Sequence, residues 1–222
     1  MQSIERVERL EDLPEPTPAA DYVMIDVILA STAVVRLLEA GVTTVRPFFA
    51  KDDALAYREV ADDVVLIGEQ GGVPIDEFDL PPLPSILAGA DLAGSRVGLL
   101  TSNGTRVVER VGLGRSLFVG CPANASAVAD VLTERDRDVW LVAAGRQGTP
   151  TPEDTAGADL LEATLTGERT DETTARAREA IRESPTAGWL AGSGLEDDVE
   201  SVLAVDSSDV VPVLEDGVFR TH

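Results

Sequence analysis

The sequence predicts an α/β domain, a three-layer α/β/α sandwich around a parallel or mixed β-sheet. Short apolar runs alternate along the chain with segments of helical periodicity, the pattern of strands joined by helices. Glycine or small polar residues follow most of the apolar runs, as they do at strand-to-helix turns. A length of 222 residues, of which 44% are hydrophobic, is enough for one domain with a substantial core.

The N-terminal residues do not fit this alternation. Residues 1–20 include Pro14, Pro16 and Pro18 and carry charge throughout, so we expect an irregular lead-in there. The domain itself is expected to span residues 21–222, because no linker-like stretch divides them.

Six short apolar runs have the length and composition of buried strands. They cover residues 22–28, 42–47, 64–68, 95–100, 116–120 and 138–144. A last strand or hairpin is expected over residues 210–213 and 217–220.

Helical segments follow most of these runs. Ser31 or Thr32 suits an N-cap before residues 33–40, and Gly41 suits the end of that helix. Two acidic residues open the segment 52–61, where they favour a helix N-terminus. Further helices are expected from Arg106 onward, over residues 123–133, 152–166 and 168–183, and after Gly194. The two successive helices before residue 184 interrupt the alternation of strands and helices. A mixed sheet is therefore an alternative to a parallel one.

Acidic residues dominate the charge of the chain. It has 40 Asp and Glu against 18 Lys and Arg, a formal net charge of −22, and Lys51 is its one lysine. Such a chain is repelled by nucleic acids and anionic membranes, so neither is expected as a partner. The acidic surface either captures cations or a basic partner, or keeps the protein solvated in a high-salt cytoplasm. The scarcity of lysine favours the second interpretation.

The same sequence predicts a cytoplasmic protein. No apolar run approaches the roughly 18 residues of a membrane helix. The first 20 residues lack the apolar core of a signal peptide. A homo-oligomer, in which a second copy of the chain is the partner, remains an alternative to a monomer.

Cys121 is the one cysteine and His222 the one histidine. An internal disulfide, a Ser-His-Asp triad and a multi-histidine metal centre are therefore not expected. A metal in this protein would have to be held by oxygen ligands, which favours Mg²⁺.

Polar or glycine-rich turns follow five of the predicted strands, where ligands bind in open α/β sheets. Residues 101–105, TSNGT, offer hydroxyls, an amide and backbone N–H groups to a phosphate-like anion. Asn124 suits a ligand contact or a helix cap, and Arg146 an oxyanion contact or a surface ion pair. Each turn alone is typical of ordinary helix capping. Because five such turns occur together, a ligand-binding site and ordinary capping are equal alternatives.

Asp26 interrupts one apolar run, and Glu69 follows the end of another. Burying a carboxylate is costly without a partner. The two are therefore either magnesium ligands or catalytic acids, or caps of neighbouring turns. For Asp154, at the start of a predicted helix, capping is the simpler interpretation.

Taken in order, these turns resemble motifs of the 2-phosphosulfolactate phosphatase family of coenzyme M biosynthesis. The resemblance runs from about Val23 to Arg220. The matching stretches are residues 26–32 (DVILAST), 68–72 (GEQGG), 78–84 (FDLPPLP), 101–105 (TSNGT), 124–127 (NASA), 144–145 with 153–154, and 196–198 with 211–212.

The resemblance implies a magnesium-dependent hydrolase of a small phosphorylated acid, 2-phosphosulfolactate giving sulfolactate and phosphate. Asp26 and Glu69 would then be catalytic and hold the metal with Asp154. A water molecule or the Asp26 carboxylate would attack phosphorus. The residues expected to bind phosphate or substrate are Ser31, Thr32, Asn103, Gly104, Thr105, Asn124 and Arg146.

Two departures from the family's pattern bear on this expectation. Leu29 and Gln70 stand where the resembling motifs carry arginine, and guanidinium groups are the usual partners of phosphate, sulfonate and carboxylate. Two alternatives to the family activity follow: a phosphatase for a less charged ester, and a catalytically reduced paralogue acting as a ligand-binding or interaction protein.

Overall fold

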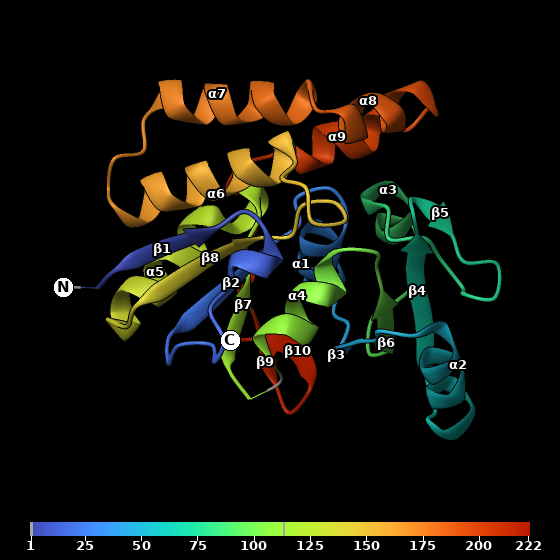
Figure 1. Cartoon of the computed structure of the whole chain (residues 1–222). Helices are drawn as coiled ribbons and strands as arrows, with labels where there is room; N and C mark the ends of the chain where they lie inside the picture. The colour runs from blue at the N-terminus through green and yellow to red at the C-terminus, as the bar shows by residue number, and fades with distance from the viewer. Residues whose placement is uncertain (1, 113) are drawn as a thin grey trace.

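A computed structural model describes residues 2–112 and 114–222 and confirms the α/β class (Figure 1). The described strands form one ten-stranded sheet in the order β1-β8-β2-β7-β9-β10-β3-β6-β4-β5. Their bounds, in chain order, are β1 (Ile4–Val7), β2 (Asp21–Ile25), β3 (Thr44–Pro47), β4 (Val64–Gln70), β5 (Val73–Pro74), β6 (Arg96–Leu100), β7 (Ser116–Val119), β8 (Val139–Ala143), β9 (Pro212–Glu215) and β10 (Val218–Thr221).

Helices cover both faces of this sheet, as the sandwich prediction requires. Their bounds are α1 (Ala30–Glu39), α2 (Lys51–Val60), α3 (Pro84–Ala88), α4 (Gly104–Val111), α5 (Ala125–Arg135), α6 (Pro152–Leu165), α7 (Asp171–Arg182), α8 (Pro185–Gly192) and α9 (Glu196–Val202). In Figure 1, α7 and α8 lie outside α6 and α9, and add an outer layer at one side of the molecule.

The sheet is mixed, and it consists of two parallel halves that run in opposite directions. β1, β8, β2 and β7 are mutually parallel, and so are β3, β6 and β4. The hairpin β9–β10 joins the halves through three antiparallel pairings in succession, from β7 to β9, β9 to β10 and β10 to β3. A C-terminal hairpin was expected from the sequence, but its place in the middle of the sheet was not.

The core follows the alternation of side chains along each strand. In β2, Tyr22 and Met24 belong to the hydrophobic cluster that contains α1 and α4, whereas Val23 and Ile25 belong to the cluster with α5 to α9. The first cluster also takes in residues of β3, β6 and β10, so α1 and α4 pack against both halves of the sheet. This shared helical layer brings together the turns that precede α1 and α4.

Three segments contain elements that the sequence does not predict. The lead-in contains the edge strand β1, which pairs in parallel with β8, and a 3₁₀ turn at Leu10–Asp12. The proline-rich loop before residue 84 includes β5 and leads into α3. The segment before the short acidic helix is itself a helix, α8, whose first turn is capped by Ser184 Oγ.

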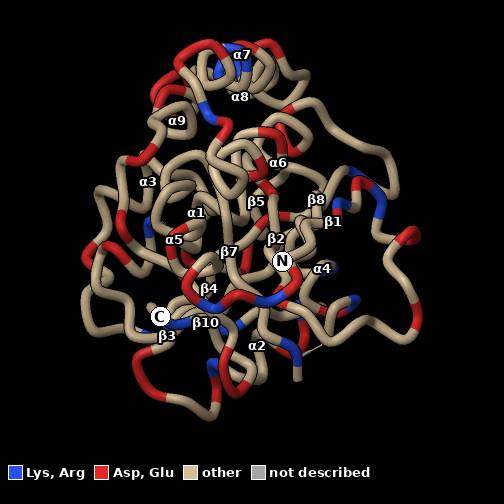
Figure 2. Tube along the Cα trace, turned by 90° about the vertical axis from the view of Figure 1, so that its left-hand side faces the viewer, with Lys and Arg blue, Asp and Glu red and all other residues tan. Residues whose placement is uncertain are grey.

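Acidic residues are spread over the outer elements of the molecule. Figure 2 shows them on the outer helices and on the connecting loops, with fewer basic residues between them. No helix in the described part of the chain is long and apolar enough to span a membrane.

Candidate active site

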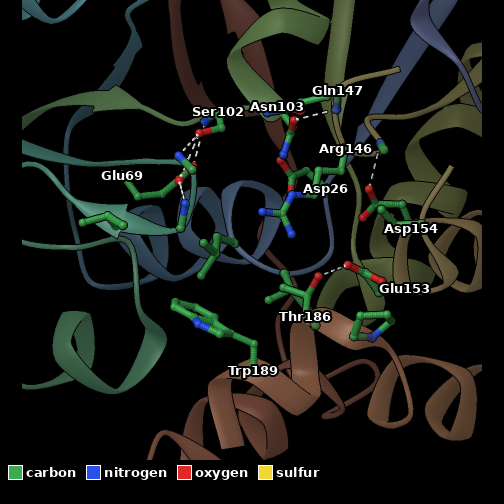
Figure 3. A pocket seen from close by; sticks show the side chains of 18 residues that line it. Asp26, Glu69, Ser102, Asn103, Arg146, Gln147, Glu153, Asp154, Thr186 and Trp189 are labelled. Carbon is green, nitrogen blue, oxygen red and sulfur yellow. Dashed lines mark hydrogen bonds between the residues drawn. The ribbon is translucent and has the colours of Figure 1, made fainter. Parts of the chain in front are cut away.

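A pocket of about 260 Å³ lies at the carboxyl ends of β2, β4, β6 and β8 and is covered by α8 (Figure 3). These four strands come from both halves of the sheet. Four carboxylates line the pocket, those of Asp26, Glu69, Glu153 and Asp154, and each of these residues is at most 6% exposed.

Asp26 follows β2 and lies beside the first turns of two helices. Its backbone N–H donates to Ser31 Oγ at 2.9 Å, which fixes the turn into α1. A Cβ placed on Gly104, the first residue of α4, would lie 2.4 Å from Ala30 Cβ and 2.9 Å from Asp26 Oδ2. Only glycine allows this approach, and it places the Asp26 carboxylate at the positive ends of both helix dipoles.

Asp154 connects the turns after β2 and β8. Its Oδ1 accepts a hydrogen bond from the Val27 backbone N–H at 2.8 Å, and its Oδ2 accepts one from the Gly145 N–H at 2.9 Å. The capping interpretation from the sequence thus holds in part, although the N–H groups belong to distant turns rather than to its own helix.

Glu153, the residue before it, was not among the site residues expected from the sequence. Its Oε1 accepts a hydrogen bond from Thr186 Oγ1 on α8 at 2.6 Å. Its Oε2 is buried and has no hydrogen-bond partner among the described residues. A buried carboxylate oxygen without a donor is costly, so Oε2 is available to a ligand in the pocket.

Burial and mutual repulsion alter the acidity of this cluster. Burial raises the pKa of Asp26 well above its usual range, and the charges of Asp154, Glu69 and Glu153 raise it further. Burial also raises the pKa of Asp154 to about 7, with a contribution from Glu153 that the backbone N–H groups of Val27 and Gly145 oppose. A bound cation would remove this repulsion.

Glu69 holds two turns of the second half-sheet together. Its Oε1 accepts from the Ser102 N–H at 2.7 Å, and its Oε2 accepts from the Gly72 N–H at 2.6 Å and from Ser102 Oγ at 3.1 Å. Three of the roughly four acceptor positions of the carboxylate are therefore used. Glu69 lies in the pocket as expected, and its hydrogen bonds favour a positioning role over that of a principal metal ligand.

Arg146 extends into the pocket from the tight turn after β8 (Figure 3). Positive φ angles at Gly145, Gln147 and Gly148 shape this turn, and Arg146 pairs with Thr149 across it. The Gln147 N–H donates to Asn103 Oδ1 at 3.4 Å, so the turn contacts the start of α4. Arg146 and Asn103, both expected at the site, are thus brought together with Asp26.

Five residues for which the sequence suggested phosphate contacts are not lining residues of the pocket: Ser31, Thr32, Gly104, Thr105 and Asn124. Thr32 Oγ1 donates to Val27 O at 2.7 Å, and Thr105 Oγ1 donates to Thr101 O at 2.7 Å. The Asn124 side chain bonds Cys121 N–H, Val119 O and Val210 O. Their polar groups stabilise turns, and Gly104 acts by the space that it leaves.

Within residues 2–112 and 114–222, no group of three or more His, Cys, Asp or Glu side chains is arranged to hold a metal ion. Magnesium, however, is typically held by one or two carboxylates together with substrate phosphate and water. The buried Glu153 Oε2 and the nearby Asp26 carboxylate fit that description.

Comparisons with known proteins give one family. A family model described as 2-phosphosulpholactate phosphatase matches residues 7–217. A probable 2-phosphosulfolactate phosphatase of Deinococcus radiodurans is 33% identical, over 96% of this chain and 93% of its own. Proteins of the same description from Thermotoga petrophila and Thermoplasma acidophilum are 32% and 30% identical, over 92% and 88% of this chain and 93% and 86% of theirs.

Proposed function

The chain belongs to the 2-phosphosulpholactate phosphatase family, and on this premise we propose that it hydrolyses the phosphate monoester of a small 2-hydroxy acid with Mg²⁺. The reference ester is 2-phosphosulfolactate, which would give sulfolactate and phosphate. The observation that carries the proposal is the buried, unpartnered Glu153 Oε2 in a pocket with three further carboxylates.

Charge supports the requirement for a cation. A phosphate monoester of an acid is multiply anionic, and four carboxylates would repel it from a pocket to which Arg146 contributes a single guanidinium. Asp26 and Glu153 would hold Mg²⁺, with Asp154 beside them. When bound, Mg²⁺ supplies a positive charge that neutralises the phosphoryl oxygens and polarises the P–O bond.

The residues of the chain would then bind and orient the ester. The start of α4, where Asn103 lines the pocket, would receive a phosphoryl oxygen, because helix N-termini bind anions. Arg146 would bind the carboxylate of the acid as a planar pair of hydrogen bonds. Thr186 would keep Glu153 Oε2 turned towards the pocket by donating to the other oxygen.

The test measures phosphate release from 2-phosphosulfolactate at high salt, with Mg²⁺ or with a chelator. We expect turnover only with Mg²⁺, and a loss on the order of 10²-fold in Glu153→Gln. Glu162→Gln is the matched control, since Glu162 lies on the same helix but its side chain is 42% exposed and pairs with Arg6. Turnover that persists in the chelator and in Glu153→Gln would refute the proposal.

A further inference from the structure

One wall of the pocket is apolar. It is formed by Ile28 and Leu29 in the turn after β2, by Val73 of β5 and by Trp189 of α8. Val73 is 64% exposed and Trp189 is 49% exposed, and they are two of the four large hydrophobic residues found exposed in the described chain. Hydrophobic side chains that gather at the mouth of a polar pocket indicate a ligand with an apolar part.

The apolar wall is held in place against the carboxylates. A Cβ on Gly72 would lie 3.7 Å from the ring of Trp189, so the indole rests on the turn between β4 and β5. The N–H of Gly72 is in turn bound by Glu69 Oε2 at 2.6 Å. Glu69 therefore positions the turn on which Trp189 rests, and it also holds Ser102 in the polar part of the pocket.

The positive charge of the pocket is limited. Arg146 is the one Lys or Arg among its described lining residues. A phosphorylated 2-hydroxy acid has three substituents on the ester carbon besides hydrogen. The phosphate would use the cation, the carboxylate would use Arg146, and no second guanidinium lines the pocket for a further anion on the third substituent.

Building on the proposed function, we propose that the third substituent is apolar, and that it packs against Trp189, Val73 and Leu29. The substrate class is thus the phosphate ester of a 2-hydroxy acid with an aliphatic or aromatic side chain. Trp189 is the specificity-determining residue of this wall.

Three esters test this assignment because they differ only at the third substituent. They are 2-phospholactate with a methyl group, 2-phosphosulfolactate with a sulfonate and 2-phospho-3-phenyllactate with a phenyl ring. We expect kcat/KM to be highest for the phenyl ester, by roughly tenfold or more over the methyl ester, and lowest for the sulfonate. Affinities measured by calorimetry with Mg²⁺ should follow the same order.

Variants of the wall identify its contribution. Trp189→Ala should lower the ratio of kcat/KM for the phenyl ester over the sulfonate ester by roughly tenfold, and Trp189→Phe should restore most of it. Phe49→Ala is the matched control, because Phe49 is 46% exposed but does not line the pocket. That variant should leave the ratio unchanged.

The outcomes separate this inference from the proposed function. Preference for the sulfonate ester, or a ratio that Trp189→Ala does not change, overturns the apolar wall while the phosphatase stands. If no ester is hydrolysed, the proposed function fails, and the calorimetric order still decides the inference: tightest binding of the phenyl ester supports it, and tightest binding of the sulfonate overturns it.

Discussion

Two aspartates lie at opposite ends of β2, and both are buried, but their surroundings differ. Asp21, at the amino end of the strand, is 0% exposed and is held by Arg135 Nε at 2.6 Å and Arg137 Nη1 at 3.0 Å. Asp26 follows the carboxyl end and is 6% exposed, and the charges that affect it are those of other carboxylates.

This difference separates a structural carboxylate from a functional one. Removing a carboxylate from water costs several kcal/mol unless an opposite charge compensates it. At Asp21 the protein supplies that charge itself through two guanidinium groups. At Asp26 the nearby charges are those of other carboxylates, which supports the proposal that a cation binds there.

Asp26→Asn should have the largest effect on activity. Phosphate release should fall on the order of 10³-fold, because the amide neither carries the charge nor holds the cation. The free energy of unfolding without Mg²⁺ should stay equal or rise, since the substitution removes repulsion. Thermal unfolding of the variant checks this, and a strong loss of stability would show that Asp26 is structural instead.

Asp21→Asn should give the opposite pattern. The free energy of unfolding should fall by about 2 kcal/mol, less than for a fully buried pair because the Arg135 and Arg137 side chains are 29% and 44% exposed. Denaturant titration measures the fall, and kcat/KM of the folded fraction should stay within about twofold. A large loss of turnover in the folded fraction would contradict the interpretation that Asp21, at the amino end of β2, is structural and Asp26, at the carboxyl end, is functional.

The pH dependence of stability should come from the pocket when Mg²⁺ is chelated. The folded protein binds protons more tightly at Asp26 and Asp154 than the unfolded chain does, since both pKa values are raised, that of Asp154 to about 7. The stability of the chelated protein is therefore highest in mild acid and falls as the pH rises through about 7.

We expect this fall to reach roughly 2 kcal/mol between pH 5 and pH 8, and to shrink when Mg²⁺ is present. Chemical denaturation at each pH, with and without Mg²⁺, gives the two profiles. Asp26→Asn should reduce the slope of the chelated profile, and the contribution of Asp154, which comes from burial and Glu153, should remain. Identical slopes with and without the ion would argue against a cation at this end of β2.

Gly104→Ala tests the close approach of the two helices at Asp26, and we expect a modest loss of stability. The added methyl group would overlap Ala30 Cβ and crowd Asp26 Oδ2, which costs about 1–2 kcal/mol of unfolding free energy. Phosphate release should fall further than this loss of stability implies. Gly188→Ala is a control, since nothing lies within 4 Å of a Cβ there.

The sequence predicts the positions of most strands and the location of the candidate site residues after their carboxyl ends. It does not predict that these ends belong to two half-sheets that run in opposite directions. Asp26 and Glu69 could be selected because a carboxylate at the end of an apolar run is costly to bury. The edge strand β1 could not be predicted, because its IERV segment has two adjacent charged residues and no alternation of apolar with polar residues. It is stabilised by pairing with β8 rather than by its own composition.

Side-chain direction explains most of the remaining differences at the site. Ser31 and Thr32 have the composition of a phosphate-binding turn, but their hydroxyls donate to main-chain oxygens of β2 and of the turn that follows it. Glu153 resembles any acid in the first turn of a helix, and its role depends on Thr186, which lies 33 residues further along the chain. Contacts of that range are set by tertiary packing, which a local pattern does not encode.

The hairpin that joins the two half-sheets has a consequence for biosynthesis. β9 and β10 follow, in the chain, every strand that they connect. During translation each half-sheet can begin to form as it leaves the ribosome, but the halves cannot be joined until this hairpin has emerged. The nascent chain therefore exposes the inner edges of β7 and β3 until late in synthesis, and the candidate pocket, which α8 helps to line, is among the last features to form.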